Sequence, residues 1–177
     1  MNKPSTFYHA SENRNIIEFE PRNKKVRDPE EGPKVFATPS KSLATIFLVQ
    51  TDSRWVASGL HNHVPYIVIS DWKKYKAMDH GGTIYHLPPE TFEVDLTKGL
   101  REYEWTSSVP VKPTKKEVYE SGFDAMLDSG VQVYVVNTEI FNQIKQSEDH
   151  GFTILQNIQS ENQKLNRNYK SFKQNEI

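Results

Sequence analysis

The apolar runs of this chain are short, and they alternate irregularly with segments of helical pattern. The two clearest runs are PYIVIS (65–70) and VQVYVVN (131–137), which are rich in β-branched and aromatic residues. Weaker strand patterns cover residues 6–9, 34–37, 83–88, 91–96 and 100–107, so we expect about seven short strands. This irregular order favours an α+β fold with a split or strongly bent mixed β-sheet and flanking helices over a doubly wound parallel sheet.

Composition excludes several classes of site. The 177 residues include no cysteine, which rules out a thiolate nucleophile, a cysteine-ligated metal and a disulfide framework. The formal net charge is −1, so no global field attracts nucleic acid or an anionic membrane. The segment MNKPSTFYHAS lacks the apolar run of a signal peptide, and no run is long enough to cross a bilayer. We therefore expect a cytoplasmic protein without a membrane partner.

The chain divides into a core and two additions. Residues 1–113 hold most of the strand patterns and form the expected core. Residues 114–146 predict a helix–strand–helix extension of the same domain, whose first helix runs from Lys115 to Ser129 with Thr114 as its cap. Residues 147–177 predict an amphipathic helix that packs on the domain or forms a homo-oligomer. Its apolar stripe consists of Leu155, Ile158, Asn162, Leu165, Tyr169 and Phe172.

The stretch KVFATPSKSLATIFLV (34–49) begins as a strand and ends as a helix. Thr38 is placed to cap the helix, and Leu43, Ile46 and Phe47 share one helical face. The hydroxyls of Thr38, Ser40 and Ser42, with the backbone N–H groups of the first helical turn, can bind a phosphate or a ribose hydroxyl. Ordinary helix capping explains the same residues. The stretch alone leaves both interpretations open.

Carboxylates and histidines supply further candidates. Glu102 and Glu104 are two residues apart on an expected strand and so share a face, either toward solvent or toward a cleft. His9 ends the first strand beside small residues, where an imidazole can meet a ligand. His61 and His63 are also two apart and would share a face on a strand, as metal ligands can. The flanking Asn62 and a proline at position 65 instead favour a loop with structural histidines.

Three separated segments together resemble the ADP-ribosyltransferase-like fold. They are FYHAS (7–11), VFATPSKSLA (35–44) and EYEWTSSVPVKP (102–113), and they span about residues 6–113. This fold is shared by poly-ADP-ribose polymerases, bacterial mono-ADP-ribosylating toxins and RNA 2′-phosphotransferases. The resemblance implies that the protein binds NAD and transfers ADP-ribose to a macromolecular acceptor, which the sequence does not identify.

The resemblance also implies roles for individual residues. His9 matches the histidine that hydrogen-bonds a ribose of NAD, and Ser11 matches the hydroxyl residue that follows it. Ser40 and Ser42 match the helix start, where Ser42 would line the nicotinamide pocket. Glu104 matches the catalytic glutamate that opens a late strand.

Two further positions complete the expected nucleotide site. Arg22 lies in the loop after the first strand and would, by position, sit near the pyrophosphate. Thr38 belongs to the hydroxyl cluster at the strand-to-helix joint. The expected catalytic residues are thus Glu104 and His9, and the expected NAD-binding residues are His9, Ser11, Arg22, Thr38, Ser40 and Ser42.

One departure from the family pattern keeps other functions open. The tyrosine that stacks on nicotinamide in the polymerase-like branch falls at Val35, and valine cannot stack in that way. A nucleotide-binding or protein-interaction module without catalysis on the same fold is therefore an alternative. A further alternative is an RNA 2′-phosphotransferase-like enzyme, although the arginines of this chain form no recognisable pattern.

Overall fold

The computed structural model describes residues 2–23, 29–149 and 151–165. Within them, nine strands form three sheets, and the sheet orders are β1-β5-β8, β2-β7-β6 and β3-β4-β9. The first sheet contains β1 (Phe7–Ser11), β5 (Gly82–Leu87) and β8 (Lys115–Tyr119). The second contains β2 (Val35–Ala37), β7 (Trp105–Ser107) and β6 (Glu93–Val94), and the third β3 (Val56–His61), β4 (Val64–Ile69) and β9 (Gln132–Val135).

The described part of the chain also contains five α-helices and three short 3-10 helices. The α-helices are α1 (Lys41–Thr45), α2 (Trp72–Met78), α3 (Gly122–Asp128), α4 (Thr138–Gln146) and α5 (Phe152–Leu165). The 3-10 helices are η1 (Pro29–Glu31), η2 (Ile46–Leu48) and η3 (Arg101–Tyr103). All strand pairs are antiparallel except β4 with β9, so the predicted mixed α+β class is confirmed. Within the described residues, each sheet has an open, linear strand order.

A backbone bridge joins the first two sheets. The backbones of Tyr8 in β1 and Thr38 after β2 exchange two hydrogen bonds, at 2.7 and 3.0 Å. Beyond this bridge the sheets diverge around a shared apolar cluster, in which Phe7 packs against Phe92 and Trp105. The strand-to-helix joint at 34–49 therefore begins where the two sheets meet.

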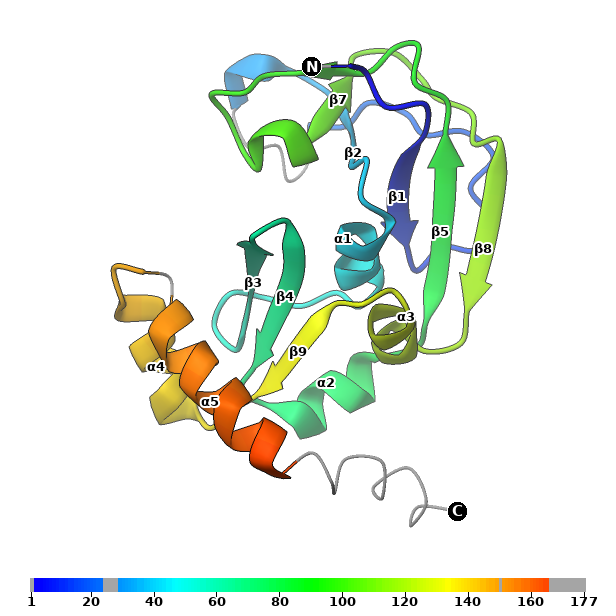
Figure 1. The fold of residues 1–177 in the computed structure, drawn as a ribbon. Helices are drawn as coiled ribbons and strands as arrows, with labels where there is room; N and C mark the ends of the chain where they lie inside the picture. The colour runs from blue at the N-terminus through cyan, green and yellow to red at the C-terminus, as the bar shows by residue number, and fades with distance from the viewer. Residues whose placement is uncertain (1, 24–28, 150, 166–177) are drawn as a thin grey trace.

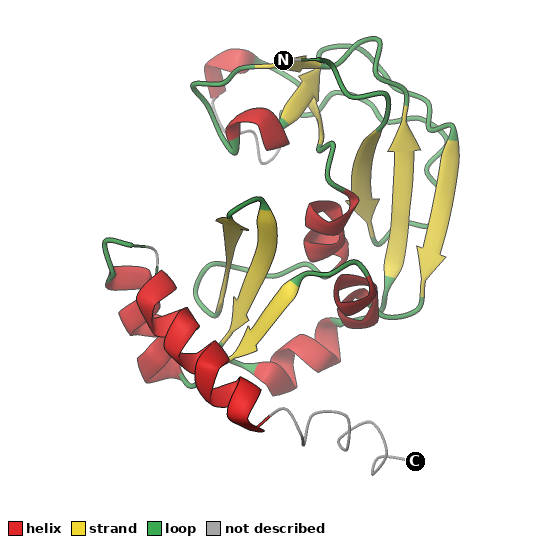
Figure 2. Cartoon of the chain, viewed as in Figure 1, coloured by secondary structure: helices red, strands yellow, loops and turns green. Residues whose placement is uncertain are grey.

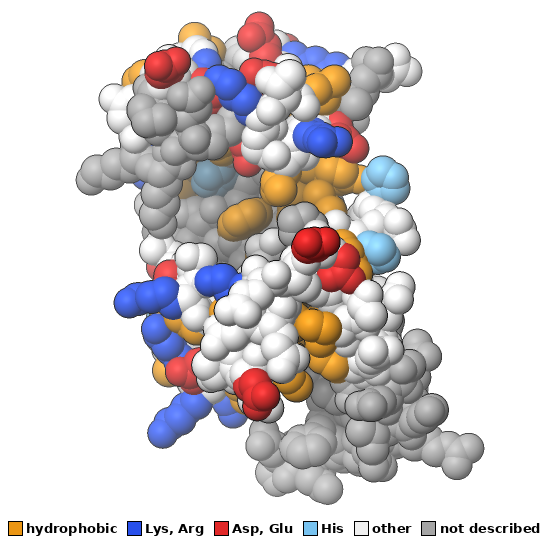
Figure 3. Space-filling view, turned by 90° about the vertical axis from the view of Figure 1, so that its left-hand side faces the viewer, with side chains coloured by type: hydrophobic (Ala, Val, Ile, Leu, Met, Phe, Trp, Pro, Cys, Tyr) orange, Lys and Arg blue, Asp and Glu red, His pale blue; other side chains and the backbone are white. Residues whose placement is uncertain are grey.

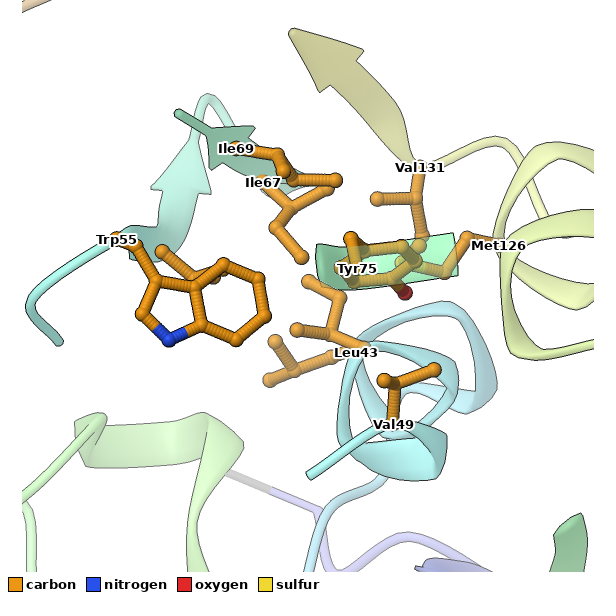
Figure 4. Packing of buried hydrophobic residues seen from close by; sticks show 10 residues of the cluster. Leu43, Val49, Trp55, Ile67, Ile69, Tyr75, Met126 and Val131 are labelled. Carbon is orange, nitrogen blue, oxygen red and sulfur yellow. The ribbon is translucent and has the colours of Figure 1, made fainter. Parts of the chain in front are cut away.

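Strand β4 forms the centre of the third sheet and is buried on both faces. Ile67 and Ile69 face a cluster that contains Leu43, Trp55 and Tyr75 (Figure 4). The alternate residues of β4, Tyr66 and Val68, face a second cluster formed with α4 and α5. Burial on both faces explains why this strand is a continuous apolar run in the sequence.

The helices lie on both sides of the third sheet. Helices α1 and α3 lie between it and the first sheet, whereas α4 and α5 cover its other face (Figures 1 and 2). Helix α1 contacts β1 and β5, and α3 contacts β9. Within the described ranges, no helix combines the length and apolar character that a membrane span requires.

The expected helix from Lys115 to Ser129 is wrong in its first part. Residues Lys115–Tyr119 form strand β8, which pairs with β5 through five residue pairs. The helix begins only at Gly122, with the Ser121 hydroxyl accepting from Asp124 N as its cap. Pairing with the open edge of β5 overrides the helical preference of Lys and Glu in this segment.

The predicted C-terminal helix begins at Phe152 and is described as far as Leu165. Leu155 is buried and Ile158 packs against the same cluster, so this part of the predicted stripe packs on the domain itself. The side chains of Asn162 and Leu165, and the whole of Tyr169 and Phe172, lie outside the part that the structure describes.

Candidate functional site

A cavity of about 440 Å³ opens where the first and second sheets meet α1. The side of the molecule that faces left in Figure 1 is hollowed, and hydrophobic side chains gather in the hollow (Figure 3). The walls of the cavity come from β1, the segment after it, β2, α1, η2 and η3. The lining residues that carry charge or can donate and accept hydrogen bonds are Tyr8, His9, Glu20, Arg22, Lys34, Thr38, Tyr103 and Glu104. Four of the predicted site residues (His9, Arg22, Thr38 and Glu104) therefore line one cavity.

His9 is held in a defined tautomer. Its Nδ1 lies 2.7 Å from the carbonyl oxygen of Phe36, and because a carbonyl only accepts, Nδ1 must carry the proton. Burial lowers the pKa of His9, and the charge of Arg22 lowers it further, against the opposing effect of the Phe36 hydrogen bond. The ring is therefore neutral at pH 7, and Nε2 is its hydrogen-bond acceptor.

Two cations line the cavity on neighbouring backbone segments. The backbones of Arg22 and Lys34 pair with each other, at 3.1 and 3.2 Å, which places both residues at the same wall. The Lys34 ammonium donates to the Ser108 hydroxyl at 2.7 Å, and the Arg22 side chain is exposed. Glu104 directly precedes β7 and also lines the cavity, but the antiparallel register of β7 with β2 places it at the Ala37 end of this strand pair, whereas Lys34 lies at the other end, next to Ser108. The site thus combines positive charge with a carboxylate and a neutral imidazole.

Two of the aromatic residues that line the cavity, Phe47 and Tyr103, were not expected there from the sequence. Phe47 is 54% exposed although it lines the cavity. Phe47 was expected on one helical face with Leu43 and Ile46; Leu43 lines the same cavity, but the helix ends at Thr45, and Phe47 lies in the 3-10 helix η2, where it is exposed while Leu43 and Ile46 are buried. Tyr103 lies in η3 and also lines the cavity.

The expected strand over residues 100–107 is likewise only partly present. Residues Arg101–Tyr103 form the 3-10 helix η3, and the strand begins at Trp105. Glu102 and Glu104 therefore do not share a strand face. The backbone carbonyl of Glu102 accepts a hydrogen bond from the Trp105 indole, whereas Glu104 lines the cavity.

Three predicted nucleotide-binding residues lie outside the cavity lining. Ser11 accepts a hydrogen bond from Asn13 N at the end of β1. Ser40, not Thr38, is the N-cap of α1, because its hydroxyl accepts from Leu43 N. Ser42 and Ser40 hydroxyls lie 3.0 Å apart and bond to each other. Thr38 instead accepts from Ser40 N and lines the cavity, so capping is the observed role of these serines.

A neighbouring ion-pair network directs Lys41 toward β8. Its ammonium contacts Glu117 at 2.5 Å, and the other oxygen of Glu117 contacts His86 at 2.5 Å. Burial raises the pKa of Glu117, but the hydrogen bonds from Lys41, His86 and Tyr119 outweigh it and lower the value to about 2. Lys41 therefore fixes α1 to the first sheet.

No protein-family model, curated protein or solved structure gives a significant match to this chain. Functional inference consequently depends on the geometry of the cavity.

Proposed function

We propose that this protein is an ADP-ribosyltransferase-like enzyme that binds NAD and transfers ADP-ribose to a macromolecular acceptor. The observation that carries the proposal is that His9, Arg22 and Glu104, which come from three distant segments, line one cavity. A volume of about 440 Å³ is within the range of small-molecule sites, roughly 300–1,000 Å³.

Each group suits one part of a dinucleotide. Neutral His9 presents Nε2 as an acceptor for a ribose hydroxyl, because Nδ1 is committed to Phe36. Arg22 and Lys34 supply positive charge for the diphosphate. Phe47 supplies an exposed ring against which a flat base can stack.

Glu104 is the proposed catalytic residue. NAD supplies a glycosidic bond whose nicotinamide leaves with the bonding electron pair, and the acceptor forms the new bond to the same ribose carbon. Positive charge develops on the ribose during this exchange, and the Glu104 carboxylate stabilises it. Glu104 also orients the incoming nucleophile and takes up its proton.

The test is NAD cleavage by Glu104→Gln beside Glu102→Gln, a matched control two residues away that does not line the cavity. Glu104→Gln should lower the rate by about 10²–10³-fold, the usual effect of losing one electrostatic contact to a transition state. Glu102→Gln should cleave NAD at the wild-type rate. Equal rates in the two variants would refute the role of Glu104.

One observation favours nucleotide binding without turnover as a second candidate. Val35, the position of the expected stacking tyrosine, is 3% exposed and belongs to the core between the first two sheets. This candidate predicts that wild-type protein binds ADP-ribose but leaves NAD intact.

The RNA 2′-phosphotransferase alternative receives less support. Arg14 pairs with Glu120 and Arg54 pairs with Asp52, and neither arginine lines the cavity. Arg27 lies outside the described residues.

A further inference from the structure

The two histidines at the tip of the β3–β4 hairpin have separate partners. The His61 ring packs on Phe152 of α5, with ring centroids 3.9 Å apart. His63 Nδ1 lies 2.6 Å from the hydroxyl of Tyr103, which lines the cavity. The tip of this hairpin thus contacts both α5 and the cavity wall, and in Figure 1 it points toward the green helical turn at residues 101–103.

The hairpin turn presents His63 in a fixed position. The loop between β3 and β4 consists of Asn62 and His63 alone, and both residues have positive φ, 48° and 67°. Two positive φ values in a two-residue loop are typical of a type I′ turn, which matches the twist of the flanking strands. Because β4 is buried on both faces, the base of this hairpin is rigid, and the turn holds His63 opposite η3.

The segment that carries Glu104 needs such support. Helix η3 is a single turn, and Arg101 within it has a φ of 52°, which is unfavourable for a residue other than glycine. The Trp105 indole donates to the Glu102 carbonyl and fixes the backbone of the turn. The Tyr103 side chain, on the cavity side, is held by His63.

We propose that His63 is a positioning residue for the cavity: its bond to Tyr103 fixes the Tyr103 ring and, through η3, the approach of Glu104. The consequence for ligand affinity rests on the proposed function, but the consequence for η3 does not. His63 itself does not line the cavity, so its proposed effect on a ligand passes through Tyr103.

Two substitutions distinguish the effect of losing the Tyr103 contact from the effect of disturbing the hairpin turn. His63→Gly creates Asn-Gly, the preferred type I′ sequence, so the hairpin should be at least as stable while the contact is lost. His63→Asn keeps a hydrogen-bonding atom for the Tyr103 hydroxyl, because the amide O and N of Asn are as many bonds from Cα as His Nδ1 is. Asparagine also tolerates positive φ. His80→Gly, at an exposed histidine that does not line the cavity, is the control.

The first readout needs no ligand. Hydrogen exchange of the Tyr103 and Glu104 amides, which donate to the Leu100 and Arg101 carbonyls around η3, should be faster by about threefold to tenfold in His63→Gly. Exchange should be near the wild-type rate in His63→Asn and His80→Gly. In a Tyr103→Phe background, His63→Gly should add nothing. Unchanged exchange in His63→Gly, with an undiminished melting temperature, would overturn the proposal.

The second readout is the affinity for ADP-ribose, measured by calorimetry. His63→Gly should weaken it by about threefold to tenfold, and His63→Asn should restore it. Wild-type affinity in His63→Gly would refute the link from His63 to the ligand. If the wild-type protein binds no ADP-ribose, the proposed function fails, and the exchange measurement still decides the role of His63.

Discussion

His9 Nδ1 donates a hydrogen bond to the carbonyl oxygen of Phe36 at 2.7 Å, and this bond joins the first sheet to the second beside the cavity. It fixes the tautomer of His9 and orients the ring. The two sheets, His9 and the strand-to-helix joint are therefore parts of one local arrangement.

His9 should make stability depend on pH in a predictable direction. Its pKa in the folded protein is below the ordinary value of 6.5, mainly because of burial, so the unfolded chain binds more protons between the two values. The stability that depends on His9 being neutral is therefore fully present above the unfolded pKa of about 6.5. It is lost as the pH falls from that value through the lower pKa of the folded state. Urea unfolding at pH 7 and pH 5 should show a larger loss of stability for wild type than for His9→Asn, whose side-chain amide can donate to the Phe36 carbonyl but does not titrate. Equal losses would contradict the neutral state of His9.

Phe47 should affect binding more than folding. Because its ring is 54% exposed, Phe47→Ala should change the free energy of unfolding by less than about 1 kcal/mol. Loss of a stacking surface should weaken ADP-ribose binding by about tenfold. Leu43→Ala is the contrasting variant, since Leu43 is buried and its truncation should cost about 2–5 kcal/mol. A large stability loss in Phe47→Ala would show that the ring is structural.

Gly81 should be much less replaceable than Gly130, although both have positive φ, 67° and 81°. A Cβ at Gly81 would lie 2.1 Å from the Tyr119 carbonyl oxygen, whereas a Cβ at Gly130 would meet nothing within 4 Å. Gly130→Ala should cost about 1 kcal/mol from backbone strain alone. Gly81→Ala should cost several times more, because β8 must move away from β5. Similar melting temperatures for the two variants would contradict the close pairing at this end of the first sheet.

The strands that the sequence predicts most directly are those written as continuous apolar runs. PYIVIS became β4, because burial on both faces of a sheet demands continuous apolar residues. VQVYVVN became β9, whose Tyr134 is buried although Val135 is 50% exposed. Residues 115–119 were wrongly predicted as helix, because KKEVY has helical composition but pairs as a strand with the edge of β5. That choice depends on a strand about thirty residues earlier and leaves no local signal.

The candidate site was also predictable only in part, because some of its residues are placed by turns and local hydrogen bonds that the sequence pattern does not mark. His9 and Glu104 each end or precede a strand, and the resemblance placed them in one site. Ser40 and Ser42 satisfied the same pattern but bond locally to α1 and to each other. Phe47 and Tyr103 reach the cavity because 3-10 turns interrupt the expected helix and strand, and no periodicity in the sequence marks those interruptions.

The most direct test of the central claim is calorimetric titration of ADP-ribose into the wild-type protein and into His9→Ala and Arg22→Ala. The account predicts saturable binding of one ADP-ribose per chain. It also predicts an affinity lower by about tenfold or more in each variant, because each loses a hydrogen-bonding or charged contact to the ligand. Absence of saturable heat with both ADP-ribose and NAD at millimolar concentration, or equal affinity in all three proteins, would contradict it.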